Sequence, residues 1–85
     1  MLLKVFTKDD GPETREAKEF GERISDEGYE VEYFDLDDFE TDQAKEIYDI
    51  TTSPAILVVT DDGKLIEIWQ GSLPTESETL NLMRL

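Results

Sequence analysis

Residues 51–69, TTSPAILVVTDDGKLIEIW, contain the pattern that decides the fold. Ala55 to Val59 are five consecutive apolar residues, as in a strand that is buried on both faces. The tripeptide Asp61-Asp62-Gly63 is a tight-turn signal, and strand-forming residues resume from Leu65 to Trp69. We therefore expect two antiparallel strands joined as a hairpin, the first of them central in a sheet.

The N-terminal third predicts a strand followed by a helix. Leu2 to Thr7 is a short, mainly apolar run that suits a buried strand. Pro12 can serve as the first residue of a helix, so we expect a helix that begins at Gly11 or Pro12 and runs to about Glu27, before Gly28. Small and apolar residues form one stripe along this helix, at i, i+3, i+4 and i+7. They are Ala17, Phe20, Gly21 and Ile24.

Residues 29–34 predict a strand at the edge of the sheet. Apolar residues alternate there with glutamates, which is the period of a strand with one wet face, and glutamates suit an edge. Phe34 is the odd one out, since it falls in the series of glutamate positions. The apolar positions are Tyr29, Val31 and Tyr33, and the glutamates are Glu30 and Glu32.

Two further helices are expected. Residues 35–38 read as a polar loop, and a short helix that ends near Asp49 should follow it. The residues with helical spacing on that helix are Ala44, Ile47 and Tyr48. Near the C-terminus, Thr75-x-x-Glu78 has the spacing of a capping box and predicts a helix that runs to the end of the chain. Its apolar residues are Leu80, Leu82, Met83 and Leu85.

In chain order the expected elements are therefore βαβαββα. A right-handed crossover through the first helix makes the first two strands parallel, whereas the hairpin is antiparallel. The fold class is α/β, a four-stranded mixed sheet with helices on both faces. With 85 residues the chain is long enough for one compact core, so residues 1–85 should form a single domain.

The charge balance limits the kinds of partner. The chain has 22 acidic and 8 basic residues, a formal net charge of −14. This argues against nucleic-acid binding, which needs clustered Lys and Arg, and it suits solubility or a basic protein partner. No apolar run is long enough for a signal peptide or a membrane span. We expect a soluble, cytoplasmic monomer that does not bind membranes.

The chain contains neither Cys nor His. A disulfide framework, a thiolate nucleophile, a thiolate metal site and the usual zinc and proton-shuttle sites are therefore excluded. A cluster of four aspartates suggests a calcium loop, but Phe39 occupies the third ligand position, so a solvated acidic loop is the preferred interpretation. We expect no cofactor and no metal, and we interpret Trp69 as a packing residue of a strand. The four aspartates are Asp35, Asp37, Asp38 and Asp42.

The element order and the tetrapeptide Thr52-Ser53-Pro54-Ala55 together resemble the thioredoxin and glutaredoxin family across essentially the whole chain. The resemblance implies a thioredoxin-like fold. In that family the matching proline is cis and faces the active site, and the residue before it offers backbone hydrogen bonds to an extended substrate. By this resemblance, those roles would fall on Pro54 and Ser53.

Residues 11–18 are similar to the glutaredoxin Cys-Pro-x-Cys segment and the helix that follows it, with Gly11 and Thr14 at the two cysteine positions. A second register, against the thioredoxin Cys-Gly-Pro-Cys, places Asp10 and Glu13 there instead. Neither register contains a thiol, and dithiol chemistry requires a thiolate. Thr14 cannot replace it, because its hydroxyl stays protonated at neutral pH and no His is present as a base. The chain is therefore expected not to be an enzyme.

Glutathione is a candidate ligand, but nearby negative charges disfavour its binding. Lys8 matches a glutaredoxin lysine that helps to hold the glutathione carboxylate, yet Asp9 and Asp10 beside it would repel the same anion. Gly11 has two interpretations, a residual site for an anion or peptide at the helix start, or a flexible N-cap, which we prefer.

Three functions remain open. The first is a redox-inactive module that binds a protein or peptide in the former active-site groove. The second is a thiol-disulfide oxidoreductase scaffold whose two cysteines were lost or engineered away. The third is a regulatory partner that binds a basic protein through the acidic helix positions Glu16, Glu19, Glu22 and Glu27, which serve equally as a solvated face. The groove residues of the first hypothesis are Lys8, Gly11, Pro12, Thr14, Ser53, Pro54 and Gly71.

Overall fold

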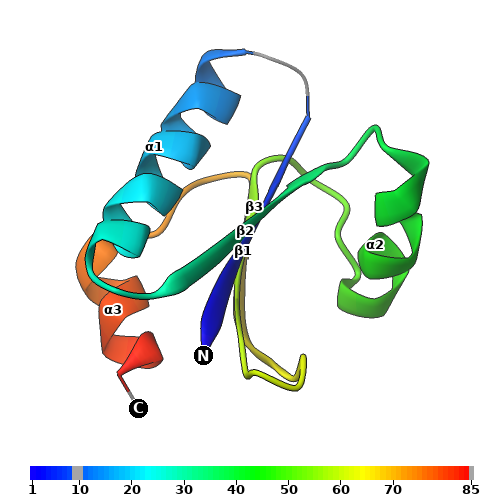
Figure 1. Cartoon of the computed structure of the whole chain (residues 1–85). Helices are drawn as coiled ribbons and strands as arrows, with labels where there is room; N and C mark the ends of the chain where they lie inside the picture. Colours follow the sequence, from blue (N-terminus) through cyan, green and yellow to red (C-terminus); the bar gives the residue numbers. More distant parts are fainter. Residues whose placement is uncertain (9–10, 85) are drawn as a thin grey trace.

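The computed structural model describes residues 1–8 and 11–84, and it has the predicted order of elements (Figure 1). The strands are β1 (Leu2–Thr7), β2 (Glu30–Asp35), β3 (Ala55–Val59) and β4 (Leu65–Gln70). The helices are α1 (Pro12–Asp26), α2 (Asp42–Tyr48) and α3 (Glu76–Met83), with a 3₁₀ turn at Phe39–Thr41 before α2.

The four strands form one mixed sheet in the order β2-β1-β3-β4. β1 pairs with β2 in parallel and with β3 antiparallel, and β3 and β4 form the antiparallel hairpin. All five residues of β3 are buried, which confirms the prediction of a central strand. The prediction that the glutamate-bearing strand lies at an edge is also confirmed, because β2 has no neighbour beyond β1 among the described residues.

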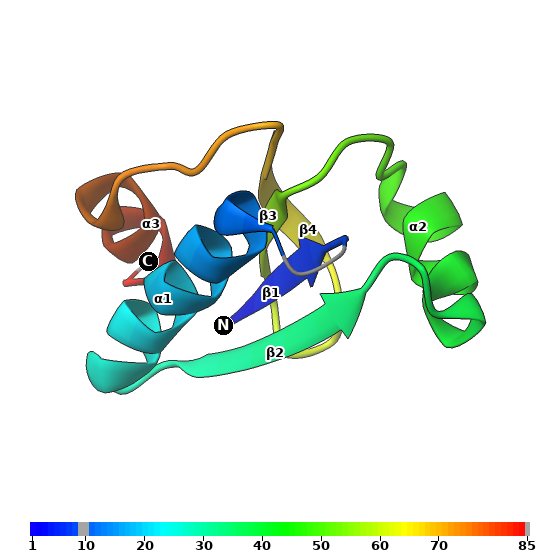
Figure 2. The ribbon, with the colours of Figure 1, turned by 90° about the horizontal axis from the view of Figure 1, so that it is seen from above.

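Helices cover both faces of the sheet: α1 and α3 lie on one side and α2 on the other (Figures 1 and 2). Two separate cores result. The larger, on the side of α1 and α3, consists of Leu3, Val5, Ala17, Phe20, Ile24, Ile56, Val58, Leu80 and Met83. The smaller, on the side of α2, consists of Phe6, Leu36, Ile50, Ala55, Leu57 and Val59. Adjacent residues of β1 and β3 alternate between the two cores, as strand geometry requires.

The helix ends follow the sequence signals. Gly11 is the N-cap of α1 with Pro12 directly after it, and the helix ends at Asp26, followed by Gly28 at a φ of 96°. Thr75 caps α3, because its Oγ1 accepts a hydrogen bond from the Glu78 N–H at 3.1 Å. The predicted N-cap at Thr75 is therefore correct, and the Glu78 carboxylate accepts from the Thr75 hydroxyl at 3.2 Å. Helix α3 ends at Met83, and the predicted continuation through Leu85 lies outside the described residues.

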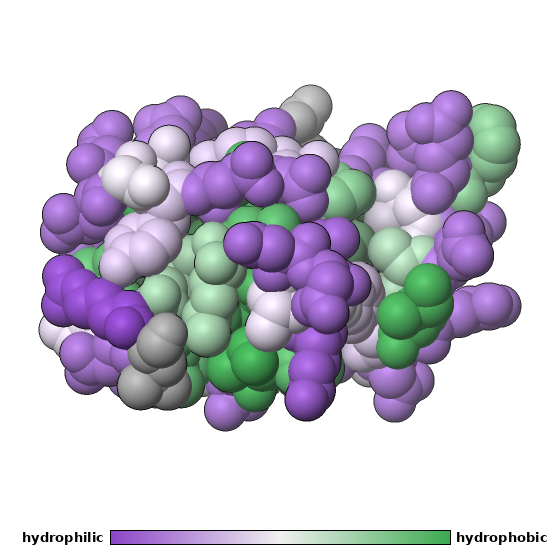
Figure 3. Space-filling model, turned by 60° about the horizontal axis from the view of Figure 1, so that its bottom comes forward, coloured by the Kyte–Doolittle hydropathy of each residue, from purple (hydrophilic) through white to green (hydrophobic). Residues whose placement is uncertain are grey.

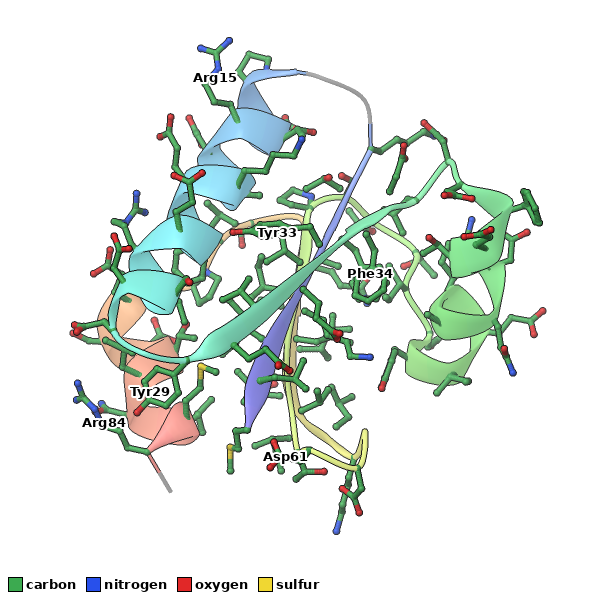
Figure 4. All side chains as sticks on the ribbon, viewed as in Figure 1. Arg15, Tyr29, Tyr33, Phe34, Asp61 and Arg84 are labelled. Carbon is green, nitrogen blue, oxygen red and sulfur yellow. The ribbon has the colours of Figure 1, made fainter. Side chains whose placement is uncertain are left out.

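The structure explains the one exception in the alternation of β2 and corrects one expectation about α2. Phe34, the odd one out among the glutamate positions, has its ring stacked on Phe6 with centroids 4.6 Å apart. The parallel register places these two residues side by side, so the α2 side of β2 is covered at this point, and Tyr33 points toward α1 instead (Figure 4). Ile47 was expected on the packed face of α2, but 66% of it is exposed. The residues of α2 that pack against the smaller core are Ala44 and Tyr48, four residues apart.

On the face seen in Figure 3, hydrophilic residues surround a smaller group of apolar residues. None of the helices within residues 1–8 and 11–84 combines the length and the apolar character needed to cross a membrane.

Candidate functional site

The residues of the predicted groove gather at one end of the sheet. Lys8 follows β1, and the Ser53-Pro54 pair leads into β3. Since β1 and β3 are antiparallel and Phe6 lies opposite Ala55, the segments beyond these two residues leave the sheet at the same end. The N-terminus of α1 starts at this end as well, at Gly11 (Figure 1).

Thr14 stands at one of the two positions where the sequence resemblance predicts a cysteine. It is buried, with 4% exposed, and its Oγ1 donates a hydrogen bond to the Lys8 carbonyl oxygen at 2.9 Å. This bond ties the first turn of α1 to the end of β1. The hydroxyl proton is therefore already used, and Thr14 has a structural role here rather than a nucleophilic one.

Gly11, the other such position, is open. Its φ of −88° is accessible to any residue, and a Cβ atom built on it meets nothing within 4 Å. Among the described residues, no side chain makes a capping hydrogen bond here. Asp10, which the second register placed at the first cysteine position, lies outside the described residues, as does Asp9.

The Ser53–Pro54 peptide bond is cis, the conformation that the resemblance implies. The Pro54 carbonyl accepts a hydrogen bond from the Gly71 N–H at 2.9 Å, which joins the end of β4 to the start of β3. Gly71 has a φ of 84°, and a Cβ there would approach Thr52 Cγ2 at 3.4 Å, so this turn favours glycine. Within residues 1–8 and 11–84, no hydrogen bond occupies the backbone N–H or C=O of Ser53.

Gln70 holds the segment before Ser53 in place, and the sequence analysis did not identify it. Its Oε1 accepts hydrogen bonds from the backbone N–H groups of Thr51 at 2.8 Å and Thr52 at 3.0 Å. Its Nε2 donates to the Asp49 carbonyl oxygen at 3.2 Å. A glutamine at the end of a strand carries no local signal for such a role, because its partners lie about twenty residues away in the chain.

The residues of the predicted groove are split between two separate pockets. Lys8 and Ser53 share a pocket of about 260 Å³, together with Asp37, Lys45 and Thr51. Gly11 and Thr14 share a different hollow, of about 430 Å³, whose other lining residues lie along α1. The Thr14 to Lys8 hydrogen bond connects the two halves, whereas Pro12 and Gly71 line neither of these two hollows.

Among the described residues, the pocket at Ser53 is lined by two of the eight basic residues, Lys8 and Lys45, and by one carboxylate, Asp37. Lys45 Nζ is already engaged, since it lies 3.0 Å from Asp42 Oδ1 and donates to the Leu36 carbonyl oxygen at 3.0 Å. Lys8 is exposed at the rim of the pocket.

Two aspartates of the acidic loop accept hydrogen bonds from backbone N–H groups of the loop. Asp35 Oδ1 accepts from the Asp37 N–H at 2.8 Å, and Asp38 Oδ1 accepts from the Glu40 N–H at 3.0 Å, as turn and cap residues do. In the described part of the chain, no group of three acidic side chains is arranged to hold a metal ion. Trp69 packs against the larger core, in agreement with its interpretation as a packing residue.

Comparison with protein-family models gives no match, and comparison with curated proteins gives none either. Solved structures do match. An uncharacterized thioredoxin-like protein from Clostridium perfringens superposes with a TM-score of 0.80 over 99% of this chain and 69% of its own, at 18% identity. Thioredoxin 1 from Thermosipho africanus TCF52B superposes with a TM-score of 0.75 over 99% of this chain and 91% of its own, at 15% identity.

The chain has a thioredoxin-like fold. At identities this low the likeness is one of fold, and the chemistry must be judged from the residues present. This thioredoxin-like domain has no sulfur nucleophile anywhere in its sequence, so it cannot itself exchange dithiols for disulfides.

Proposed function

We propose that this thioredoxin-like domain is a redox-inactive binding module that holds an extended peptide, or an extended loop of a partner protein, at Ser53. The observation that carries the proposal is the backbone of Ser53, which has no hydrogen bond to any other described residue and lines the pocket that it shares with Lys8. An N–H and a C=O on one residue can pair with an extended chain in the manner of a β-ladder. Gln70 and the Gly71 to Pro54 hydrogen bond keep the flanking segments in place.

The proposal requires the ligand to be recognised mainly through its backbone. We would titrate the ¹⁵N-labelled protein with the neutral peptide acetyl-Ser-Val-Ala-Val-Ser-amide and, separately, with glutathione. The amide signals of Lys8, Gly11, Thr14, Ser53 and Gly71 should shift together. The first four residues line the two pockets, and the Gly71 N–H is hydrogen-bonded to the carbonyl oxygen of Pro54, the residue after Ser53. Signals that stay unchanged with both probes would contradict a peptide site here.

Two controls separate backbone recognition from side-chain contacts. Ser53→Ala removes the hydroxyl but keeps the backbone N–H and C=O, so binding should change by less than about twofold. A peptide N-methylated at its central alanine loses one donor and should bind about fivefold more weakly, in line with the net contribution of one or two hydrogen bonds.

A second candidate function is favoured by the open space at Gly11: a thiol-disulfide oxidoreductase scaffold that lacks only its sulfurs. Cysteine fits at position 11 without a clash, and at position 14 it costs only the hydrogen bond to Lys8. The helix N-terminus that stabilises a thiolate is also retained.

Restoring both cysteines distinguishes the two functions. We would compare Gly11→Cys with Thr14→Cys against a matched Gly11→Ser with Thr14→Ser variant in dithiothreitol-driven reduction of insulin, after circular dichroism shows that both are folded. The unchanged chain is expected not to accelerate the reduction of insulin. On the binding proposal the folded cysteine variant stays at the level of the serine variant, whereas clear reduction of insulin would favour the scaffold.

A further inference from the structure

An open groove runs between α1 and β2, away from the pocket at Ser53. It has a volume of about 660 Å³, and Lys18, Glu22, Ser25, Asp26, Val31 and Tyr33 line it. It shares Lys18 and Glu22 with the hollow at Gly11, so the depression continues along α1. Figure 2 shows β2 as the free edge of the sheet beside α1.

Tyr33 forms an aromatic wall of this groove, and Gly21 sets its position. A Cβ at position 21 would lie only 2.6 Å from Tyr33 Oη, so the ring reaches its place only because residue 21 is glycine. Tyr33 lies against the helix, yet 45% of it is exposed. The cations that lie over aromatic rings in the described chain are Lys4 and Arg23, and neither lies over Tyr33.

Among the described residues, two carboxylates and one ammonium group line the groove. Glu22 and Asp26 take part in none of the ion pairs formed within residues 1–8 and 11–84. Partial burial, and then the nearby Glu22 carboxylate, raise the pKa of the Tyr33 hydroxyl above its ordinary value. Lys18 is the one positively charged residue among the described residues that line this groove.

The outer edge of β2 is itself acidic. One side of its backbone pairs with β1, and the other pairs with no strand of the described chain. Glu30 and Glu32 are exposed on this strand, on the face opposite Tyr33. Such an edge repels a second acidic strand, and the net charge of −14 disfavours a second copy of this chain. An extended segment whose positive charges face α1 meets complementary charge in the groove, from Glu22 and Asp26.

We propose that the outer edge of β2 and the α1–β2 groove together bind an extended segment of a partner protein that carries Lys and Arg side chains at alternate positions. The segment adds a strand to the sheet at β2. Its cationic side chains enter the groove, where the Tyr33 ring and the carboxylates of Glu22 and Asp26 receive them and Val31 contacts their alkyl stems. This site is independent of the one proposed at Ser53.

The probe is the peptide acetyl-KVRVKVR-amide, followed by amide signals of the ¹⁵N-labelled protein. We expect shifts concentrated in residues 30–35 and 18–26. The charge-reversed peptide acetyl-EVEVEVE-amide should not bind. The basic peptide N-methylated at alternate residues should bind about tenfold more weakly, because it cannot form the strand hydrogen bonds. Equal binding of the methylated and unmethylated peptides would overturn strand addition.

Two double variants with the same change in net charge test where on the protein the basic peptide binds. Glu22→Gln with Asp26→Asn should weaken binding about fivefold, the effect of two partly screened ion pairs, whereas Glu40→Gln with Glu46→Gln, next to or on α2, should change it by less than about twofold. Equal weakening by both pairs would show only non-specific attraction of a polycation and would overturn the proposal.

Gly21→Ala tests the geometry without changing charge. It displaces the Tyr33 ring and should weaken binding of the basic peptide about threefold or more, the loss expected for one cation–π contact. Its fold is checked by circular dichroism, and unchanged binding by a folded Gly21→Ala protein would overturn the role of Tyr33. Dimers of the unliganded protein through β2, seen by light scattering, would assign this edge to a second copy instead.

Discussion

Replacing Phe20 with alanine is expected to lower the free energy of unfolding by about 3–5 kcal/mol, the largest effect of any single substitution considered. Phe20 is 1% exposed and lies in the larger core, on the face of α1 that packs against the sheet. Its removal leaves a cavity between α1 and the sheet, and the rigid sheet cannot close it. Small domains are stable by only about 5–15 kcal/mol in total, so the variant is left close to unfolding.

Phe39→Ala is the matched control, because the same side chain is lost from a site that is 79% exposed. It should change the unfolding free energy by less than about 0.5 kcal/mol. Urea denaturation followed by circular dichroism measures both variants. A Phe20→Ala protein within 1 kcal/mol or so of the unchanged chain would mean that α1 is not packed as described.

Gln70→Ala is expected to destabilise the protein by about 1–2 kcal/mol and to abolish the coordinated response at Ser53. The Gln70 side chain satisfies two backbone N–H groups and one C=O in the segment 49–52. Without it, these groups depend on water, and the segment that presents Ser53 is held less firmly. Since the site is partly open to solvent, the cost stays below that of a fully buried network.

Gln70→Glu provides a graded comparison. Its carboxylate still accepts from the Thr51 and Thr52 N–H groups but cannot donate to the Asp49 carbonyl oxygen, so it should retain most of the stability and of the response to the peptide. Urea denaturation and the amide titration used for Ser53 measure both properties. If Gln70→Ala binds the neutral peptide as the unchanged chain does, Gln70 does not position the site.

The two proposed sites differ in the charges that line them, so their binding can be distinguished by experiment. The pocket at Ser53 is lined by Lys8 and Lys45 and offers a free backbone, so neutral or acidic extended chains suit it. The groove at Tyr33 is lined by Glu22 and Asp26 and suits cations. A salt titration should therefore weaken binding of the basic peptide steeply and binding of the neutral peptide little.

The sequence by itself was sufficient for the order and type of the elements. The apolar run Ala55–Val59, the Pro12 helix start and the Thr75 cap act through neighbours a few residues away, and each was found in its predicted role. The absence of cysteine likewise excludes thiol–disulfide exchange by the residues of this chain, because no packing arrangement can supply a missing thiol.

Only the tertiary structure decided where distant segments meet. The stacking of Phe34 on Phe6, the exposure of Ile47 and the contact of Tyr33 with Gly21 depend on strand register and helix placement. The bonds from Gln70 to residues 49–52 likewise cross from one segment to another. Local periodicity cannot specify such contacts, because each results from packing between residues that are far apart in the chain.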